Sequence, residues 1–135
     1  MPSRGFGGMQ ENPEQRAIVD KMLETIRREY GFVPVVNQVL SERPDVFVPM
    51  GNLGKAVLEA DGDIDRKHRY LCAIAAASAL GGEYCLDVQT KHAKAAGATK
   101  DEIFEAMMIG AYMAMTRSES YAFRKLASNF DMELE

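Results

Sequence analysis

Cys85 is the residue whose type and position best suit chemistry in this sequence. It lies in the stretch 81–92, between a small-residue apolar run at 73–80 and a helical pattern that Gly97 can end. A double glycine before a periodic pattern predicts a turn that delivers a helix N-terminus, which places Cys85 within about the first turn of that helix. The positive end of the helix dipole and the free backbone N–H groups favour a thiolate there. Cys85 is therefore the first candidate for a reactive thiol.

The other interpretation of Cys85 is a buried small hydrophobe, because free cysteine is among the most buried residue types. Cys72 has apolar neighbours in a central predicted helix, which indicates a core position. The two cysteines lie on consecutive predicted helices of a chain with no secretory signal pattern, so we expect thiols, not a disulfide, and a cytoplasmic protein. Glu83 lies in the same turn as Cys85 and opposes thiolate formation by like charge.

Length and composition predict one globular domain without nucleic-acid or membrane partners. A chain of 135 residues can bury a core, and its net charge of −4 argues against nucleic acid, which needs a basic surface. No apolar run approaches the roughly 18 residues of a membrane helix. Residues 1–11 are polar and rich in glycine, so we expect a disordered tail there and a domain at 12–135.

Three acidic residues, Asp61, Asp63 and Asp65, are spaced like the first ligands of a calcium loop. The twelve-residue pattern that ends in a bidentate glutamate is not completed, so these residues predict a turn and a helix N-cap. We expect no metal and no cofactor.

Helical periodicity recurs through the domain, whereas no segment alternates like a strand. The predicted helices cover residues 13–30, a short segment before Pro44, 44–58, 66–80, a segment from the double glycine to about Gly97, and a segment that a capping box at Thr99 opens. Gly51 and Gly54 indicate close helix packing, and the polar residues 116–118 predict a break or a kink before a last helix. The predicted fold is an all-α, single-domain helical bundle of about six or seven helices.

Several motifs in their order carry a resemblance to a known family. They are Gly-Phe-Val-Pro at 31–34, Arg-Pro-Asp at 43–45, a capped Asp-Arg-Lys helix start at 65–67, Gly-Gly-Glu-Tyr-Cys at 81–85, and Lys-Ala-Ala-Gly-Ala-Thr-Lys-Asp-Glu-Ile at 94–103. Over most of residues 30–130 the chain resembles the alkylhydroperoxidase D-like (AhpD-like), or carboxymuconolactone decarboxylase, family. The resemblance implies an all-α bundle that assembles into trimers or hexamers. Its peroxidase members carry C-x-x-C-x-x-x-H at the start of the central helix and a glutamate about three turns upstream.

Carried over residue by residue, the second cysteine of this motif falls on Cys85, whereas the first falls on Gly82, the histidine on Gln89 and the glutamate on Tyr70. Gly82 supplies no resolving thiol, and the Gln89 amide cannot act as a base. Tyr70, with a usual pKa of about 10, does not replace a carboxylate at neutral pH. His92 follows Cys85 by seven residues, about 10.5 Å along a helix, so we interpret it as a surface or interface histidine.

Three functions follow from the resemblance and from these replacements. The first is antioxidant, peroxiredoxin-type oxidoreductase chemistry with one thiol at Cys85, which takes a peroxide or small organic ligand and needs an external thiol. The second is a non-catalytic binding or assembly protein, in which Tyr70 and Gln89 form a buried hydrogen-bonded pair or line a ligand pocket. Decarboxylation of a lactone acid ranks third, because it also relies on the histidine that Gln89 replaces. We expect a homo-oligomer assembled through apolar, methionine-rich helices.

Overall fold

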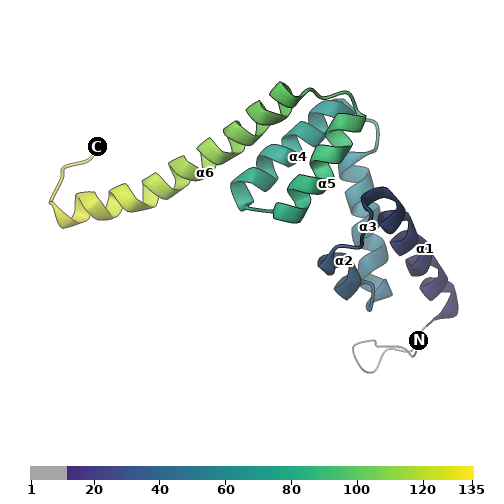
Figure 1. Cartoon of the computed structure of the whole chain (residues 1–135). Coiled ribbons are helices and arrows are strands. Elements are labelled where there is room, and N and C mark those ends of the chain that lie inside the picture. The colour runs from purple at the N-terminus through teal and green to yellow at the C-terminus, as the bar shows by residue number, and fades with distance from the viewer. Residues whose placement is uncertain (1–11) are drawn as a thin grey trace. The chain divides into compact units, whose positions relative to one another are not determined.

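The computed structural model describes residues 12–135, and this part of the chain consists of six helices joined by short connections (Figure 1). The helices are α1 (Pro13–Tyr30), α2 (Val35–Leu40), α3 (Pro44–Leu58), α4 (Arg66–Leu80), α5 (Glu83–Ala95) and α6 (Lys100–Asn129). The predicted all-α class and helix number are confirmed. The predicted tail at residues 1–11 lies outside the described residues.

The contacts of the chain divide it into two compact units, whose described residues are 12–60 and 61–135. The first unit holds α1 to α3 and the second holds α4 to α6. The single domain at residues 12–135 therefore stays a prediction. In the described part of the chain, no helix combines the length and the apolar character that crossing a membrane requires.

In the first unit, α3 packs against both α1 and α2. Asn12 caps α1 by accepting a hydrogen bond of 2.9 Å from the backbone N–H of Glu14. Gly51 confirms the predicted close packing, because a Cβ there would collide with the end of the Met22 side chain. Gly54 does not, since a Cβ at that position would meet no described atom within 4 Å.

In the second unit, α4 packs against both α5 and α6. Asp65 caps α4, and Gly81 ends it in the left-handed conformation with φ of 75°, so the chain reverses at once into α5. The core residues are Tyr70, Ile74 and Ala77 of α4, Ala93 of α5, and Ile103, Ala106 and Ala127 of α6. The second unit is thus a helical hairpin, α4–α5, with α6 laid along α4.

Gly110 lets α6 approach α4 closely. A Cβ at this position would overlap the carbonyl oxygen of Ala75 and lie 3.0 Å from the Cβ of Ser78. Because the nearest obstacle is backbone, α4 and α6 can reach this separation only with glycine at 110.

The predicted break at residues 116–118 is wrong, because α6 is one continuous helix from Lys100 to Asn129. The Thr116 hydroxyl donates a hydrogen bond of 3.0 Å to the carbonyl oxygen of Met113, so this polar side chain is satisfied within the helix. Hydroxyl residues of this kind do not interrupt a helix when its own carbonyls accept from them.

Candidate functional site

Cys85 is the third residue of α5 and lies in its first turn, as the sequence predicts. The thiol belongs to an exposed residue, so the interpretation of Cys85 as a buried small hydrophobe is wrong for the chain as described. The N-cap residue is Gly82, and no side chain caps the helix there. The Cys85 thiol therefore lies near the positive end of the α5 dipole.

Gly82 and Cys85 are close neighbours, as a two-cysteine motif would require. A Cβ at Gly82 would lie 3.3 Å from the Cβ and 3.7 Å from the Sγ of Cys85. Disulfides join Cβ atoms about 3.5–4.5 Å apart. The backbone thus keeps nearly the geometry for a disulfide at these two positions, although glycine supplies no thiol.

Tyr70 is buried in α4, with 5% of its surface exposed, and its ring contacts His92 of α5. The ring centroids of Tyr70 and His92 are 5.0 Å apart and the planes are inclined by 52°. His92 lies two turns after Cys85 on α5, so this contact sits at the other end of the hairpin from the thiol. His92 is therefore an interface residue between two helices of one chain.

Gln89 does not form the expected hydrogen-bonded pair with Tyr70 through its carbonyl oxygen. The Oε1 atom of Gln89 and the Oγ1 atom of Thr90 are both buried, with no hydrogen-bond partner among the described residues. A buried acceptor without a donor costs about 1–3 kcal/mol. The position of the family histidine is thus occupied by an amide whose oxygen is sealed from solvent.

Cys72 is exposed, which corrects its predicted core position. The buried residues of α4 are Tyr70, Ile74 and Ala77, spaced by four and three positions along one face. Cys72 is two positions from both Tyr70 and Ile74, so it points about 160–200° away from them. Apolar sequence neighbours indicated a core position, but the helix turns this residue away from it.

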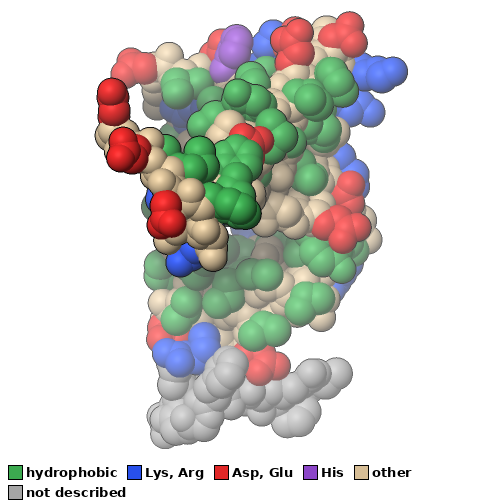
Figure 2. Space-filling model, turned by 90° about the vertical axis from the view of Figure 1, so that its left-hand side faces the viewer, with side chains coloured by type: hydrophobic (Ala, Val, Ile, Leu, Met, Phe, Trp, Pro, Cys, Tyr) green, Lys and Arg blue, Asp and Glu red, His purple; other side chains and the backbone are tan. Residues whose placement is uncertain are grey.

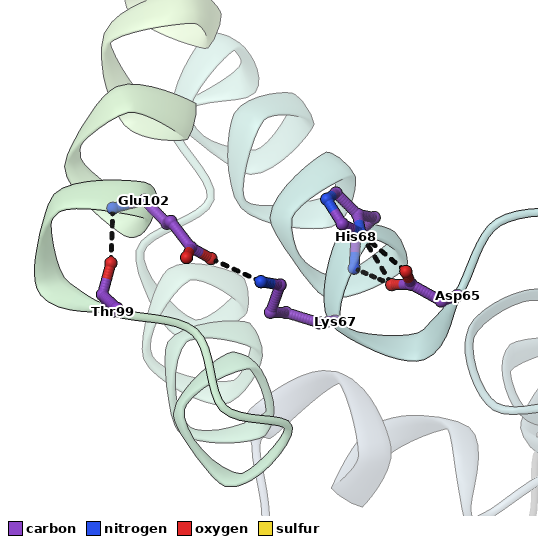
Figure 3. A network of polar contacts seen from close by, with 5 residues as sticks. All are labelled: Asp65, Lys67, His68, Thr99 and Glu102. Carbon is purple, nitrogen blue, oxygen red and sulfur yellow. Dashed lines mark hydrogen bonds and ion pairs between the residues drawn. The ribbon is translucent and has the colours of Figure 1, made fainter.

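Polar contacts link the starts of α4 and α6, as Figure 3 shows. The Nζ of Lys67 lies 3.1 Å from the Oε2 of Glu102, and the Glu102 N–H donates a hydrogen bond of 3.1 Å to the Oγ1 of Thr99. The hydrogen bond from the Glu102 N–H to Thr99 is thus one half of the predicted capping box, and the Glu102 carboxylate contacts Lys67 of α4. This ion pair joins the starts of the two helices.

Asp65 and His68 form a second contact at the start of α4 (Figure 3). The backbone N–H of His68 donates to Oδ1 of Asp65 over 2.9 Å, and the His68 Nδ1 lies 2.7 Å from the same oxygen. The backbone hydrogen bond is the larger cause, and together with the side-chain contact it holds the pKa of Asp65 below its usual value. Asp65 is an N-cap, as predicted, and the described residues offer no group of three or more potential metal ligands.

Sequence reasoning missed the contact between Tyr70 and His92, although a signal for it exists. The double glycine at 81–82 makes α4 and α5 an antiparallel hairpin, and Tyr70 and His92 stand at nearly equal distances from that turn. Residues placed symmetrically about a tight turn face each other across the hairpin. Helix spacing from Cys85 alone does not reveal this partner.

Comparison with known proteins gives two matches and one negative result. The family model of the carboxymuconolactone decarboxylase family matches residues 44–127. A protein of Paracoccus denitrificans described as uncharacterized protein 4 in cox locus is 32% identical over 71 residues, which are 53% of this chain. The matched stretch spans 64% of that relative's length. No solved structure matches the chain.

Proposed function

Because the chain belongs to the carboxymuconolactone decarboxylase family, we propose that it is an antioxidant oxidoreductase of the peroxiredoxin type with one reacting thiol, Cys85. The observation that supports this proposal is the exposed Cys85 in the first turn of α5. The N-cap residue of this helix is Gly82, which has no side chain that could cap it. A thiolate at this place faces the positive end of the helix and is open to a substrate from solution.

The proposed reaction begins when the Cys85 thiolate attacks the terminal oxygen of a hydroperoxide. The O–O bond breaks, Cys85 becomes a sulfenic acid, and the alkoxide leaves as an alcohol after taking a proton from water. An external thiol then condenses with the sulfenic acid, which forms a mixed disulfide and releases water. A second external thiol attacks this disulfide and returns the Cys85 thiolate, so one hydroperoxide and two thiols give an alcohol, water and a disulfide.

The replaced positions explain why the reductant must come from outside the chain. Gly82 lies beside Cys85 but carries no thiol that could resolve the sulfenic acid. Gln89 supplies no base one turn after Cys85, and Tyr70 contacts His92 instead of orienting a base. Turnover in the reducing cytoplasm, where small thiols are abundant, fits such a chain.

Peroxide consumption with an added thiol tests this proposal. Wild-type protein and Cys72→Ser should consume peroxide at rates within about twofold of each other, whereas Cys85→Ser should reduce the rate to that of the thiol alone. Cys72→Ser is a matched control because both cysteines are exposed. Equal rates for Cys85→Ser and wild type would refute the role of Cys85.

A second function, a binding or assembly protein without catalysis, is favoured by one observation. The Tyr70 side chain is buried against His92, which fills the position of the family glutamate with packed rings. A wild-type rate no higher than that of the added thiol alone would support this function. Lactone decarboxylation ranks last, because the Gln89 amide occupies the position of the histidine on which that reaction relies.

A further inference from the structure

Arg117, Tyr121 and Arg124 form a cationic group on α6, called here the arginine cluster. The Cζ of Arg117 lies 5.9 Å from the centroid of the Tyr121 ring, and the Cζ of Arg124 lies 5.0 Å from it. The Nη1 of Arg124 also donates a hydrogen bond of 3.2 Å to the Oγ of Ser120. All of these residues are exposed. Two guanidinium groups are therefore held beside one aromatic ring, in contact with solvent.

Neither arginine of the cluster has an acidic partner in residues 12–135. Other cations of the chain do, since Arg16, Arg43 and Lys67 each lie within 3.1 Å of a carboxylate oxygen. Glu119 follows Arg117 by two residues, so it points about 160° away from it around the helix. Two guanidinium groups side by side, without a counter-charge in this part of the chain, can bind an anion from solution.

The arginine cluster continues the face of α6 that packs on α4. Arg117 and Arg124 follow Gly110 by 7 and 14 residues, so the three positions point within about 40° of one another. Ala75 of α4 lies opposite Gly110, and α4 ends five residues later at Leu80, which is about 7.5 Å further along the helix. Arg117 lies about 10.5 Å beyond Gly110, where α6 has run past the turn between α4 and α5 (Figure 1). The cluster therefore faces space that α4 does not fill.

Cys85 lies at the same end of the α4–α5 hairpin, because α5 begins directly after the turn at 81–82. Both α5 and α6 pack on α4, and the axes of packed helices are about 8–10 Å apart, so Cys85 and Arg117 are about 10–20 Å apart. Two exposed side chains with apolar surface lie at this end, Leu80 at 81% and Tyr84 at 57%. Hydrophobic side chains also stand at the surface when the molecule is viewed from the side toward which the C-terminal end of α6 points (Figure 2). A ligand that reaches from the cluster to the thiol thus needs an anionic end and a long apolar body.

We propose that the arginine cluster binds the carboxylate of a long-chain acid whose hydroperoxide group reacts at Cys85. This inference rests on the proposed function, since it assigns the substrate class of the same thiol. A carboxylate fits the cluster because its two oxygens match the planar fork of a guanidinium. The Tyr121 ring holds both guanidinium groups before the acid arrives, which reduces the side-chain entropy that binding loses. Arg117 and Arg124 are thus specificity-determining residues, and the reaction itself stays at Cys85.

Peroxide consumption with linoleic acid hydroperoxide and with its methyl ester tests the substrate class, because the ester keeps the chain and lacks the charge. Wild type should have a kcat/KM for the acid at least about tenfold above that for the ester. Arg117→Gln combined with Arg124→Gln should bring this ratio close to one, through a higher KM for the acid. Lys125→Gln removes an exposed charge that has no ring contact and should keep the wild-type ratio. A wild-type ratio near one, or an unchanged ratio in the double arginine variant, would overturn the proposal.

Two substitutions of Tyr121 test whether the ring holds the cluster together. Tyr121→Phe keeps the ring and should keep the ratio of acid to ester. Tyr121→Leu keeps both positive charges but removes the ring, and should lower the ratio about threefold. An unchanged ratio for Tyr121→Leu would show that the charges act without the ring, which would contradict the site as proposed.

Calorimetric titration with laurate separates this inference from the proposed function, because laurate has the carboxylate and the chain but no peroxide. Wild type should bind laurate at least about tenfold more tightly than the double arginine variant does. Light scattering should give the two proteins the same mass, and a lower mass for the variant would overturn the proposal by showing that the cluster joins subunits. A protein that consumes no hydroperoxide would refute the proposed function alone. Laurate binding that does not depend on the two arginines would refute the arginine cluster as a carboxylate site.

Discussion

Replacing Gly110 with alanine should destabilise the protein by separating α6 from α4. The added Cβ would overlap the carbonyl oxygen of Ala75 and lie 3.0 Å from the Cβ of Ser78. The Ala75 carbonyl belongs to the backbone of α4, so relief requires the two helices to move apart along their contact. Overpacking of this kind costs about 1–3 kcal/mol, and the upper part of that range applies where backbone is the obstacle.

The magnitude is reduced by the better helix propensity of alanine. Glycine in a helix interior is about 1 kcal/mol less favourable than alanine, so this gain offsets part of the overpacking cost. The expected net loss in the free energy of unfolding is about 1–2 kcal/mol. Urea titration followed by circular dichroism measures this loss as a lower midpoint at an unchanged slope.

Gly54→Ala is the matched control, because Gly54 also lies inside a helix but a Cβ there would meet no described atom within 4 Å. It should stabilise the protein by about 0.5–1 kcal/mol through helix propensity alone. If Gly110→Ala raised the midpoint as Gly54→Ala does, the close packing of α4 on α6 would be wrong.

Three further predictions concern the helix starts and the thiols. Asp65→Asn should lower stability at pH 7, and its difference from wild type should shrink as the pH falls below about 3.9 and vanish only below the depressed pKa of Asp65 in the folded state, because a depressed pKa stabilises the fold only while the carboxylate is ionised. Acid titrations of both proteins at fixed urea measure this, and a difference that stays constant through the acid range would contradict it. Gly82→Cys should form a disulfide with Cys85 on oxidation, because the Cβ positions lie 3.3 Å apart, and mass spectrometry of the non-reduced protein detects this bond. The triple variant with Gln89→His and Tyr70→Glu should also consume peroxide with a dithiol reductant. A folded triple variant that neither forms the disulfide nor consumes peroxide would refute the placement of the motif. Both cysteines should react with an alkylating reagent, and Cys85 should react faster because it lies at a helix start. Peptide mass spectrometry after brief labelling measures the two rates, and faster labelling of Cys72 would contradict this expectation.

The helix boundaries could be predicted because capping is local. Asn12, Asp65 and Thr99 each accept a backbone hydrogen bond from a residue two or three positions later, so the signal and its partner lie in the same short stretch. The same locality placed Cys85 correctly in the first turn of α5. A helix start can be predicted from sequence alone because the capping residue and the N–H group it binds lie within one turn of each other.

The direction in which side chains point could not be predicted in the same way. Cys72 has apolar neighbours but lies on the side of α4 away from its packed face, and which face packs depends on α5 and α6. The partner of Tyr70 also depends on the hairpin, which brings His92 against its ring. The close approach at Gly110 requires knowing that Ala75 lies opposite, 35 residues away in sequence.

The state of Cys85 after exposure to peroxide tests the proposed function most directly. Wild-type protein would receive one equivalent of an organic hydroperoxide in the presence of dimedone, which traps sulfenic acids, and its cysteine peptides would be quantified by mass spectrometry. The proposed chemistry predicts a dimedone adduct at Cys85 that forms at least about tenfold faster than any adduct at Cys72, which is also exposed but lies in the middle of α4. Adducts that form at the same rate on both cysteines, or on neither, would contradict the claim that the start of α5 activates a thiol for peroxide reduction.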